Sequence, residues 1–164
     1  MPDINWPDRY RPDATAIHVR NDRVMDAPPG RIWAWLVRAA LWPSWYENVK
    51  DVAIEGGGTD LYPGARFRWK TFGLAIESVV EEFVPEQRIG WTGVGMGMDV
   101  YHGWLIEQRG QGCHVLTAEN QNGLAARTQG LLMPNRMHKH HQIWLESLER
   151  KAREGMPPGP GHGA

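Results

Sequence analysis

The chain has 164 residues, of which 41% are hydrophobic and 23% charged, and its net charge is −1. These values are typical of one globular domain with its own core, and the small net charge predicts no nucleic acid or anionic membrane partner. No apolar stretch approaches the ~20 residues of a transmembrane helix. The polar first residues differ from a secretory signal, so a cytoplasmic location is the default expectation. The lone cysteine excludes an intramolecular disulfide.

Three segments are expected along the chain. Residues 1–13 contain three prolines and no hydrophobic periodicity, which predicts an extended N-terminal arm with Trp6 or Tyr10 docked on the body. Residues 14–154 form the domain. Residues 155–164 are rich in glycine and proline and are predicted to be disordered.

Secondary structure within the domain follows from hydrophobic periodicity. A strand at 15–24 precedes two short helices, which begin at Pro28–Pro29 and at Trp42–Pro43, because proline suits the first turn of a helix. Six strands joined by short turns come next, and a helix at 134–153 ends the domain. Each strand is interpreted as apolar on one face only, so an antiparallel meander is expected whose apolar face is covered by the last helix.

The clearest strand pair is the hairpin at 66–81, in which apolar residues alternate with charged ones on both strands. The basic row of the first strand faces the acidic row of the second, and the apolar rows pair on the inner face. The basic row is therefore interpreted as part of a neutralised outer face rather than as a nucleic-acid site.

The helix at 134–153 has an apolar stripe and a polar side at about 100° per residue. The stripe, predicted to lie on the sheet, consists of Met137, His141, Trp144, Leu145, Leu148 and Ala152. The polar side, expected in solvent, consists of Arg136, Lys139, Gln142, Glu146, Glu149, Arg150 and Arg153.

Two glycine-rich segments do not predict a cofactor site. Residues 55–60 lead toward a strand and lack the Lys-Ser/Thr of a phosphate-binding loop. Residues 93–98 form a predicted glycine-methionine loop that also precedes a strand, whereas a dinucleotide fingerprint opens a helix. We expect no cofactor, and the loop at 93–98 is a candidate lid or interface.

A symmetric turn at Gly110–Gln111 places His102 opposite Glu119. Asp99 and Glu107 mark the outer face of their strand, so His102 points inward, and its cross-strand neighbour, about 4.5–5.5 Å away between Cβ atoms, shares that face. An inward His–Glu pair could act as a general acid or base. The alternative is a pair that is merely hydrogen-bonded.

His138 and His141 lie one helical turn apart and invite comparison with a metal site. Such a site needs at least one further ligand at a defined spacing, and His140 lies on another edge of the helix. We therefore predict no metal site, with His141 tucked inward as a core residue. Cys113 has no activating motif and is assigned no role.

Several signposts together resemble the helix-grip (SRPBCC) superfamily: AxxxxxW at 27–33, WPSW at 42–45, Pro-Gly at 63–64 before FRW, and Trp-x-x-x-Leu at 144–148. That superfamily includes START lipid-transfer domains, pathogenesis-related allergens, polyketide cyclases and cochaperone domains. The resemblance covers roughly residues 14–153. It implies an α+β fold, a curved seven-stranded antiparallel sheet wrapped around a long C-terminal helix, with two short helices between the first two strands.

The resemblance also implies an apolar cavity that binds a hydrophobic or lipid-like small molecule. The predicted wall is mostly aromatic with a few polar groups, as small-molecule sites usually are, although nine tryptophans could also form a solid core. It consists of Phe67, Trp69, Ile76, Ser78, Trp91, His102, Trp104, Met137, His141 and Trp144.

The predicted function is transport, sequestration or sensing of a ring-containing or acyl molecule, oriented by His102, Glu119 and His141. Two alternatives remain open. One is an enzyme like the polyketide cyclases and dehydratases, with His102 and Glu119 as its catalytic pair. The other is a cochaperone-like module, which requires a large exposed apolar patch. The sequence leaves a homodimer open.

Overall fold

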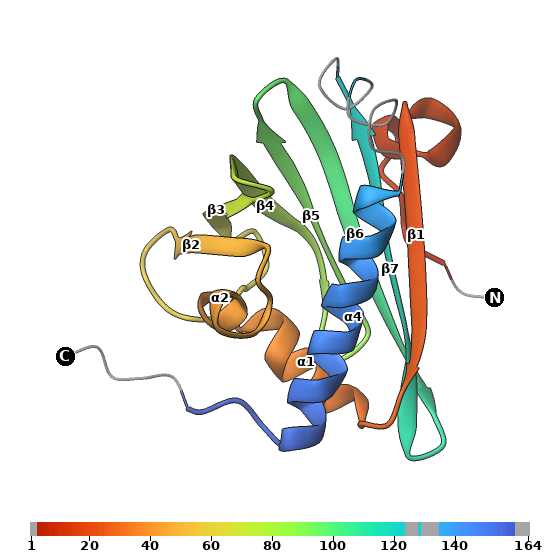
Figure 1. The fold of residues 1–164 in the computed structure, drawn as a ribbon, viewed down its shortest axis with the longest axis vertical. Helices are drawn as coiled ribbons and strands as arrows, with labels where there is room; N and C mark the ends of the chain where they lie inside the picture. Colours follow the sequence, from red (N-terminus) through yellow and green to blue (C-terminus); the bar gives the residue numbers. More distant parts are fainter. Residues whose placement is uncertain (1–2, 124–127, 129–134, 160–164) are drawn as a thin grey trace.

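The computed structural model describes residues 3–123, 128 and 135–159, and within them seven strands form one antiparallel sheet in the order β1-β7-β6-β5-β4-β3-β2 (Figure 1). The strands are β1 (Ile17–Met25), β2 (Val49–Ile54), β3 (Arg66–Thr71), β4 (Leu74–Val84), β5 (Arg88–Gly95), β6 (Met98–Arg109) and β7 (Gly112–Asn122).

Among the described residues, three α-helices accompany the sheet, namely α1 (Pro29–Val37), α2 (Trp42–Trp45) and α4 (Arg136–Glu154). Figure 1 shows α4 running along one face of the curved sheet, with α1 and α2 between β1 and β2 at one end. The predicted fold class is confirmed: a curved seven-stranded antiparallel sheet, a long C-terminal helix and two short helices between the first two strands. No helix of the described residues is long and apolar enough to cross a membrane.

The predicted loop at 93–98 is shorter than expected. β5 continues to Gly95 and pairs with Met98, so only the turn Met96–Gly97 remains, with φ angles of 49° and 75°. Gly93 lies within the sheet, at a position where a side chain would not fit. A Cβ added there would stand 2.9 Å from Cγ2 of Val100. Glycine at this position therefore allows close packing within the sheet. The glycine-methionine pattern wrongly predicted a loop over the whole of residues 93–98.

The apolar stripe of α4 packs on the sheet as predicted, and all six of its residues are buried. One residue of the expected solvent side differs. Glu149 is only 9% exposed, because the guanidinium Nε of Arg23 donates to its Oε2 at 2.6 Å and the backbone N–H of Asp26 donates to its Oε1 at 3.1 Å. Its charge is thus matched by β1 rather than by water.

The prediction that each strand is apolar on one face only was wrong for β6 and β7. Their outer side carries a second hydrophobic cluster, covered by the N-terminal arm, which contains the 3₁₀ turns Asp8–Tyr10 and Pro12–Ala14. We call it the outer-face cluster; its buried members are Ile4, Tyr10, Tyr101, Leu105, Leu116 and Ala118, and Trp6 packs against them.

Part of the tail that was expected to be disordered lies against α1. The indole Nε1 of Trp35 donates to the carbonyl of Gly155 at 2.8 Å, the guanidinium of Arg38 donates to the carbonyl of Pro158, and Pro157 is buried. These bonds to α1 and to the residue after it give the segment 155–159 a defined path. The predicted connection at 124–133 falls almost entirely outside the described residues.

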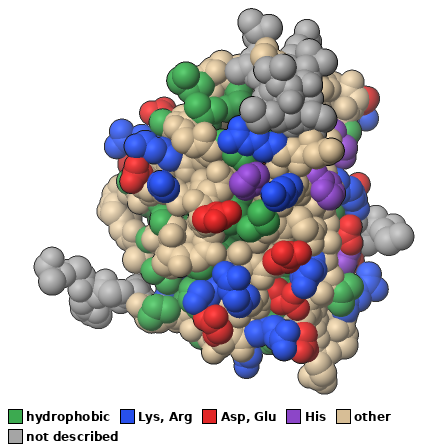
Figure 2. Space-filling model, in the orientation of Figure 1, with side chains coloured by type: hydrophobic (Ala, Val, Ile, Leu, Met, Phe, Trp, Pro, Cys, Tyr) green, Lys and Arg blue, Asp and Glu red, His purple; other side chains and the backbone are tan. Residues whose placement is uncertain are grey.

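Both signs of charge are interspersed on the face of the molecule that Figure 2 shows. Figure 2 shows lysine and arginine side chains beside aspartate and glutamate over the face that α4 occupies. The visible surface therefore offers no single-sign patch for a polyanion.

Candidate binding site

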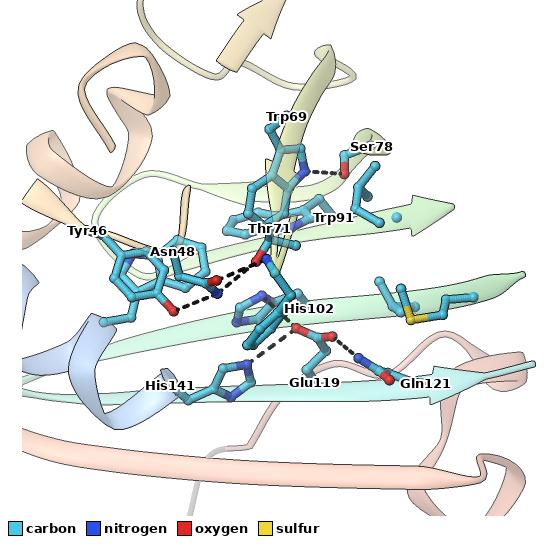
Figure 3. A pocket seen from close by; sticks show the side chains of 16 residues that line it. Tyr46, Asn48, Trp69, Thr71, Ser78, Trp91, His102, Glu119, Gln121 and His141 are labelled. Atoms are coloured by element: carbon cyan, nitrogen blue, oxygen red, sulfur yellow. Dashed lines mark hydrogen bonds and ion pairs between the residues drawn. The ribbon is translucent and has the colours of Figure 1, made fainter. Parts of the chain in front are cut away.

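A small cavity of about 40 Å³ lies between the inner face of the sheet and α4 (Figure 3). Its wall draws on β3 to β7, on α4 and on the segment after α2. The lining residues are Tyr46, Asn48, Trp69, Thr71, Phe72, Ile76, Ser78, Trp91, Gly93, Met98, Val100, His102, Glu119, Gln121, His141 and Trp144.

Most of the residues expected at the site line this cavity, whether they were predicted to bind a ligand or to be catalytic. They are Trp69, Ile76, Ser78, Trp91, His102, Glu119, His141 and Trp144. Phe67, Trp104 and Met137 do not line it. The ring of Phe67 packs edge-on against Trp42 at 6.0 Å between centroids, and Trp104 packs against Trp144 at 5.3 Å. These two rings are part of the solid core, so the cavity occupies only part of the aromatic interior.

The sequence missed half of the wall. The missed residues are Tyr46, Asn48, Thr71, Phe72, Gly93, Met98, Val100 and Gln121. Gln121 and Val100 could have been found, because each lies two residues from a predicted inward residue, Glu119 and His102 respectively, at the period that a strand imposes. Tyr46 and Asn48 lie between α2 and β2, where no periodic signal locates a side chain.

Three polar side chains meet at the inner end of the wall. The predicted pairing of His102 on β6 with Glu119 on β7 is present in the sheet register. Nδ1 of His102 lies 3.2 Å from Glu119 Oε2, and Nε2 of His141 on α4 lies 3.4 Å from the same oxygen. The two imidazole rings stack at 4.9 Å with 17° between their planes. We call these three residues the His–Glu–His cluster.

Burial sets the charge of the His–Glu–His cluster. Desolvation lowers the pKa of His102 to about 3, which outweighs the attraction of Glu119 for its charged form. Burial alone would raise the pKa of Glu119, but the hydrogen bond from His141, the two nearby imidazoles and a hydrogen bond from Gln121 lower it to about 2. Burial therefore disfavours the charged form of His102, whereas the hydrogen bonds to Glu119 favour its carboxylate form.

Further hydrogen bonds hold the cluster and the wall in place. Nε2 of His102 lies 2.7 Å from the hydroxyl of Thr117, and the amide of Gln121 donates to Glu119 Oε1 at 2.6 Å. On the opposite wall the indole of Trp69 donates to the hydroxyl of Ser78 at 3.0 Å (Figure 3). These bonds fix the direction in which the polar atoms point.

Some polar atoms of the wall remain unpaired. Nε1 of Trp144, Oε1 of Gln121 and Nδ1 of His141 are buried and have no hydrogen-bond partner in the described part of the chain. Buried polar groups are normally paired. The wall thus offers one donor and one acceptor, from Trp144 and Gln121, for a group inside the cavity.

The histidines singled out at the start of α4 separate in the structure. His138 is exposed, and His140 packs edge-on against Phe72 at 4.8 Å. Only His141 joins the cavity. The spacing of His138 and His141 was therefore uninformative, because the partners of His141 come from the sheet.

A curved sheet wrapped on a long helix, with a small aromatic cavity between them, defines a helix-grip protein. The sequence matches the family model for polyketide cyclase / dehydrase and lipid transport over residues 16–153, and the chain belongs to this family. No curated protein matches the chain.

Solved structures agree with this assignment. The chain is similar to the hypothetical protein jhp0584 from Helicobacter pylori, at 30% identity and a TM-score of 0.87, over 93% of this chain and 98% of the other. The di-domain ARO/CYC StfQ from the steffimycin biosynthetic pathway shares 12% identity at a TM-score of 0.70, over 84% of this chain and 51% of that one. Ara h 8.0201 shares 12% identity at a TM-score of 0.62, over 85% and 99%. The last two likenesses concern the fold alone.

Proposed function

We propose that the protein binds a small, ring-containing hydrophobic molecule in the cavity, with a hydrogen-bond donor of that molecule directed at Glu119. The carrying observation is the carboxyl group of Glu119, the single acidic residue among the described residues that line a mostly apolar pocket, where hydrogen bonds from His141 and Gln121 favour its ionised form. Membership of a family described by polyketide cyclisation and lipid transport supports a hydrophobic ligand.

The wall favours a flat ring over a flexible acyl chain. The rings of Trp69, Trp91 and Trp144 surround the cavity, and the rings of Trp69 and Trp144 stand 6.1 Å apart between centroids. Aromatic faces and edges attract another ring beyond the gain from buried area alone. A fatty acid would in addition bring its carboxylate toward Glu119, and like charges in a buried site repel each other strongly.

Binding requires the wall to move. The cavity of about 40 Å³ is smaller than the roughly 150 Å³ that holds benzene in an engineered apolar cavity. Phe72 is only half-buried and lies in the two-residue turn between β3 and β4, where it adopts a positive φ of 52°. Its ring packs against His140 and lies beneath the guanidinium of Arg136, both on α4. We expect the ligand to enter past this half-buried turn residue.

A cyclase or dehydratase is the second candidate, since family membership and the His102–Glu119 pair both fit it. The electrostatics favour binding instead. A general base works best with a pKa near the working pH, whereas the pKa of His102 is lowered to about 3 by burial and that of Glu119 is held at about 2 against burial by its hydrogen bonds. Both groups would therefore accept a proton poorly at neutral pH.

The test is a titration with three related probes, in which binding is measured by the change in tryptophan fluorescence. 1-Naphthol offers a ring and a donor, naphthalene a ring alone, and 1-naphthoate a ring and a negative charge. We expect 1-naphthol to bind about tenfold or more tighter than 1-naphthoate, a difference of about 1.4 kcal/mol or more, and Glu119→Gln to reduce this preference.

The matched control is Glu107→Gln, which removes a carboxylate from the same pair of strands outside the cavity, where it faces His114. This control should leave the preference unchanged. Failure of all three probes to bind, or a preference that Glu119→Gln does not alter, would contradict the proposal. Native mass spectrometry of freshly purified protein would show independently whether a molecule is carried along.

A further inference from the structure

We propose that His102, Glu119 and His141 form a binding site for a divalent transition-metal ion, with zinc and iron(II) as the fitting class. The three residues come from β6, β7 and α4, and one ligand atom from each lies within 4.8 Å of the other two. The inference concerns the same cavity as the proposed function but does not depend on which organic molecule enters it.

The residue types select the class of ion. Two imidazoles and one carboxylate are a ligand set of catalytic zinc sites and of non-haem iron(II) sites. Calcium and magnesium prefer oxygen ligands, and here only Glu119 supplies an oxygen with a full charge. Three protein ligands leave at least one coordination position open toward the cavity.

The distances require only a small adjustment. A zinc ion stands about 2.0–2.2 Å from each ligand atom, so in a tetrahedral site two ligand atoms lie about 3.3–3.6 Å apart. Glu119 Oε2 is already 3.2 Å from His102 Nδ1 and 3.4 Å from His141 Nε2. Bringing the widest separation, which is up to 4.8 Å, to that spacing takes about 1.2–1.5 Å, roughly the range that rotation of the Glu119 carboxylate and of the imidazoles supplies.

An outer shell that orients two of the three ligands is in place, whereas Nδ1 of His141 has no partner among the described residues. A metal-binding histidine normally uses its second ring nitrogen to donate to a neighbouring oxygen. Nε2 of His102 has such a neighbour, the Thr117 hydroxyl at 2.7 Å, which leaves Nδ1 directed at Glu119. Gln121 likewise holds the other oxygen of Glu119 at 2.6 Å.

Charge and size also match an ion. Among the described residues that line the cavity there is no lysine or arginine, and Glu119 is the single acidic residue. A buried carboxylate is costly without a matching positive charge. The cavity of about 40 Å³ can hold an ion with one or two bound waters.

A second polar cluster provides a matched control. His114 lies 2.8 Å from Asp22 and 3.4 Å from Glu107 on the outer side of the same strands. Its members are partly exposed, with side-chain exposures of 22%, 58% and 20%, and water competes there for the same ligand atoms. If the metal ion binds in the cavity, His114 is not needed for metal binding.

The test is a titration of chelator-treated protein with Co²⁺, followed by its visible absorption, and then displacement by Zn²⁺. We expect one tightly bound Co²⁺ per chain with the strong absorption of a low-coordinate site. Glu119→Gln and His141→Ala should weaken binding about a hundredfold or more, and Thr117→Val about tenfold. His114→Ala should bind as the wild type does.

The inference would be overturned if no stoichiometric Co²⁺ spectrum appeared, or if Glu119→Gln protein that melts like the wild type bound Co²⁺ equally well. A loss of binding in His114→Ala would move the site to the outer surface and overturn it as well. Titration of the metal-free protein with 1-naphthol separates this inference from the proposed function. If 1-naphthol binds and Co²⁺ does not, only the metal site fails.

Discussion

The strands β6 and β7 carry buried apolar side chains on both faces, but the two faces are completed differently. On the outer side the chain covers its own surface, and the arm also pairs the polar groups. The amide of Asn120 donates to the carbonyl of Tyr10 at 2.6 Å, and the hydroxyl of Tyr10 donates to Asp99 at 2.5 Å. The apolar patch that a partner-binding module would need is therefore already occupied by residues 3–14.

On the inner side several polar atoms are left over. Seven buried side-chain atoms lack a partner in the described residues, and none belongs to the outer-face cluster. Trp144, Gln121 and His141 hold three of them and line the cavity. An unpaired buried polar group costs about 1–3 kcal/mol. The outer face is thus a finished structural contact, whereas the inner face retains a cost that a ligand or ion can relieve.

The largest expected effect of a substitution lies at the centre of the inner face. Trp42 is fully buried, its ring contacts those of Phe67, Trp69, Trp91 and Trp144, and its Nε1 donates to the carbonyl of Leu36. Trp42→Ala should lower the free energy of unfolding by about 3–5 kcal/mol, measured by urea denaturation.

The control for Trp42 is Trp6→Ala on the outer face, where the indole is only half-buried and packs on Tyr101 at 5.8 Å. It should cost about 1–2 kcal/mol, because less apolar area returns to water. Equal losses of unfolding free energy in Trp42→Ala and Trp6→Ala would contradict the difference between the inner and the outer face.

The next effect tests how the arm is seated. Gly103 on β6 faces the arm, and a Cβ added there would stand 2.5 Å from Cγ2 of Ile4. Gly103→Ala should therefore displace the arm at a cost of about 1–3 kcal/mol, and limited proteolysis should cut within residues 3–14.

A deletion of residues 1–13 gives the matched background for this substitution. In the shortened chain, Gly103→Ala should lower the free energy of unfolding only slightly. Ile4, which the added methyl group would contact, is absent there. A full loss in both backgrounds would show that Gly103 is required for the strand itself rather than for the arm.

The inner face could be predicted because charges at the ends of β6 identify its sides. Asp99 and Glu107 assign the outer face, and the symmetric turn at Gly110–Gln111 sets the register that joins His102 to Glu119. His141 followed from the helical stripe. These three signals are local, so the sequence alone identifies the β6–β7 hairpin and α4, which meet at the cavity. It also identifies the residues of each that point inward.

The outer-face cluster could not be predicted by the same means. Between its charged ends β6 reads VYHGWLI, which is almost continuously apolar, and a strand buried on both faces loses the alternation that distinguishes them. The cover also comes from residues about ninety positions away in the chain: Tyr10 reaches Asp99 and Ile4 reaches Gly103. We expected Trp6 or Tyr10 to dock on the body, and both do so. No periodicity in residues 1–13 reports where they dock, because contacts of this kind depend on the finished fold.

The smallest expected effect is an alkaline weakening of the arm. Burial, together with the hydrogen bond and the negative charge of Asp99, raises the pKa of Tyr10 to about 12 from a usual value of 10. The unfolded chain therefore loses this proton at a lower pH than the folded chain does. The stability that it contributes is complete below pH 10 and is lost as the pH rises toward 12.

Tyr10→Phe isolates this contribution, because Tyr46 and Tyr101 also have raised pKa values through burial and remain in both proteins. Between pH 10 and 12 the wild type should lose on the order of 1 kcal/mol more than the variant, and its arm should become more sensitive to a protease that is active in alkali. Since Tyr10 belongs to the outer face, 1-naphthol affinity measured below pH 9 should be the same in both proteins. A changed affinity would mean that the two faces of β6 and β7 are coupled, and that the arm acts on the cavity.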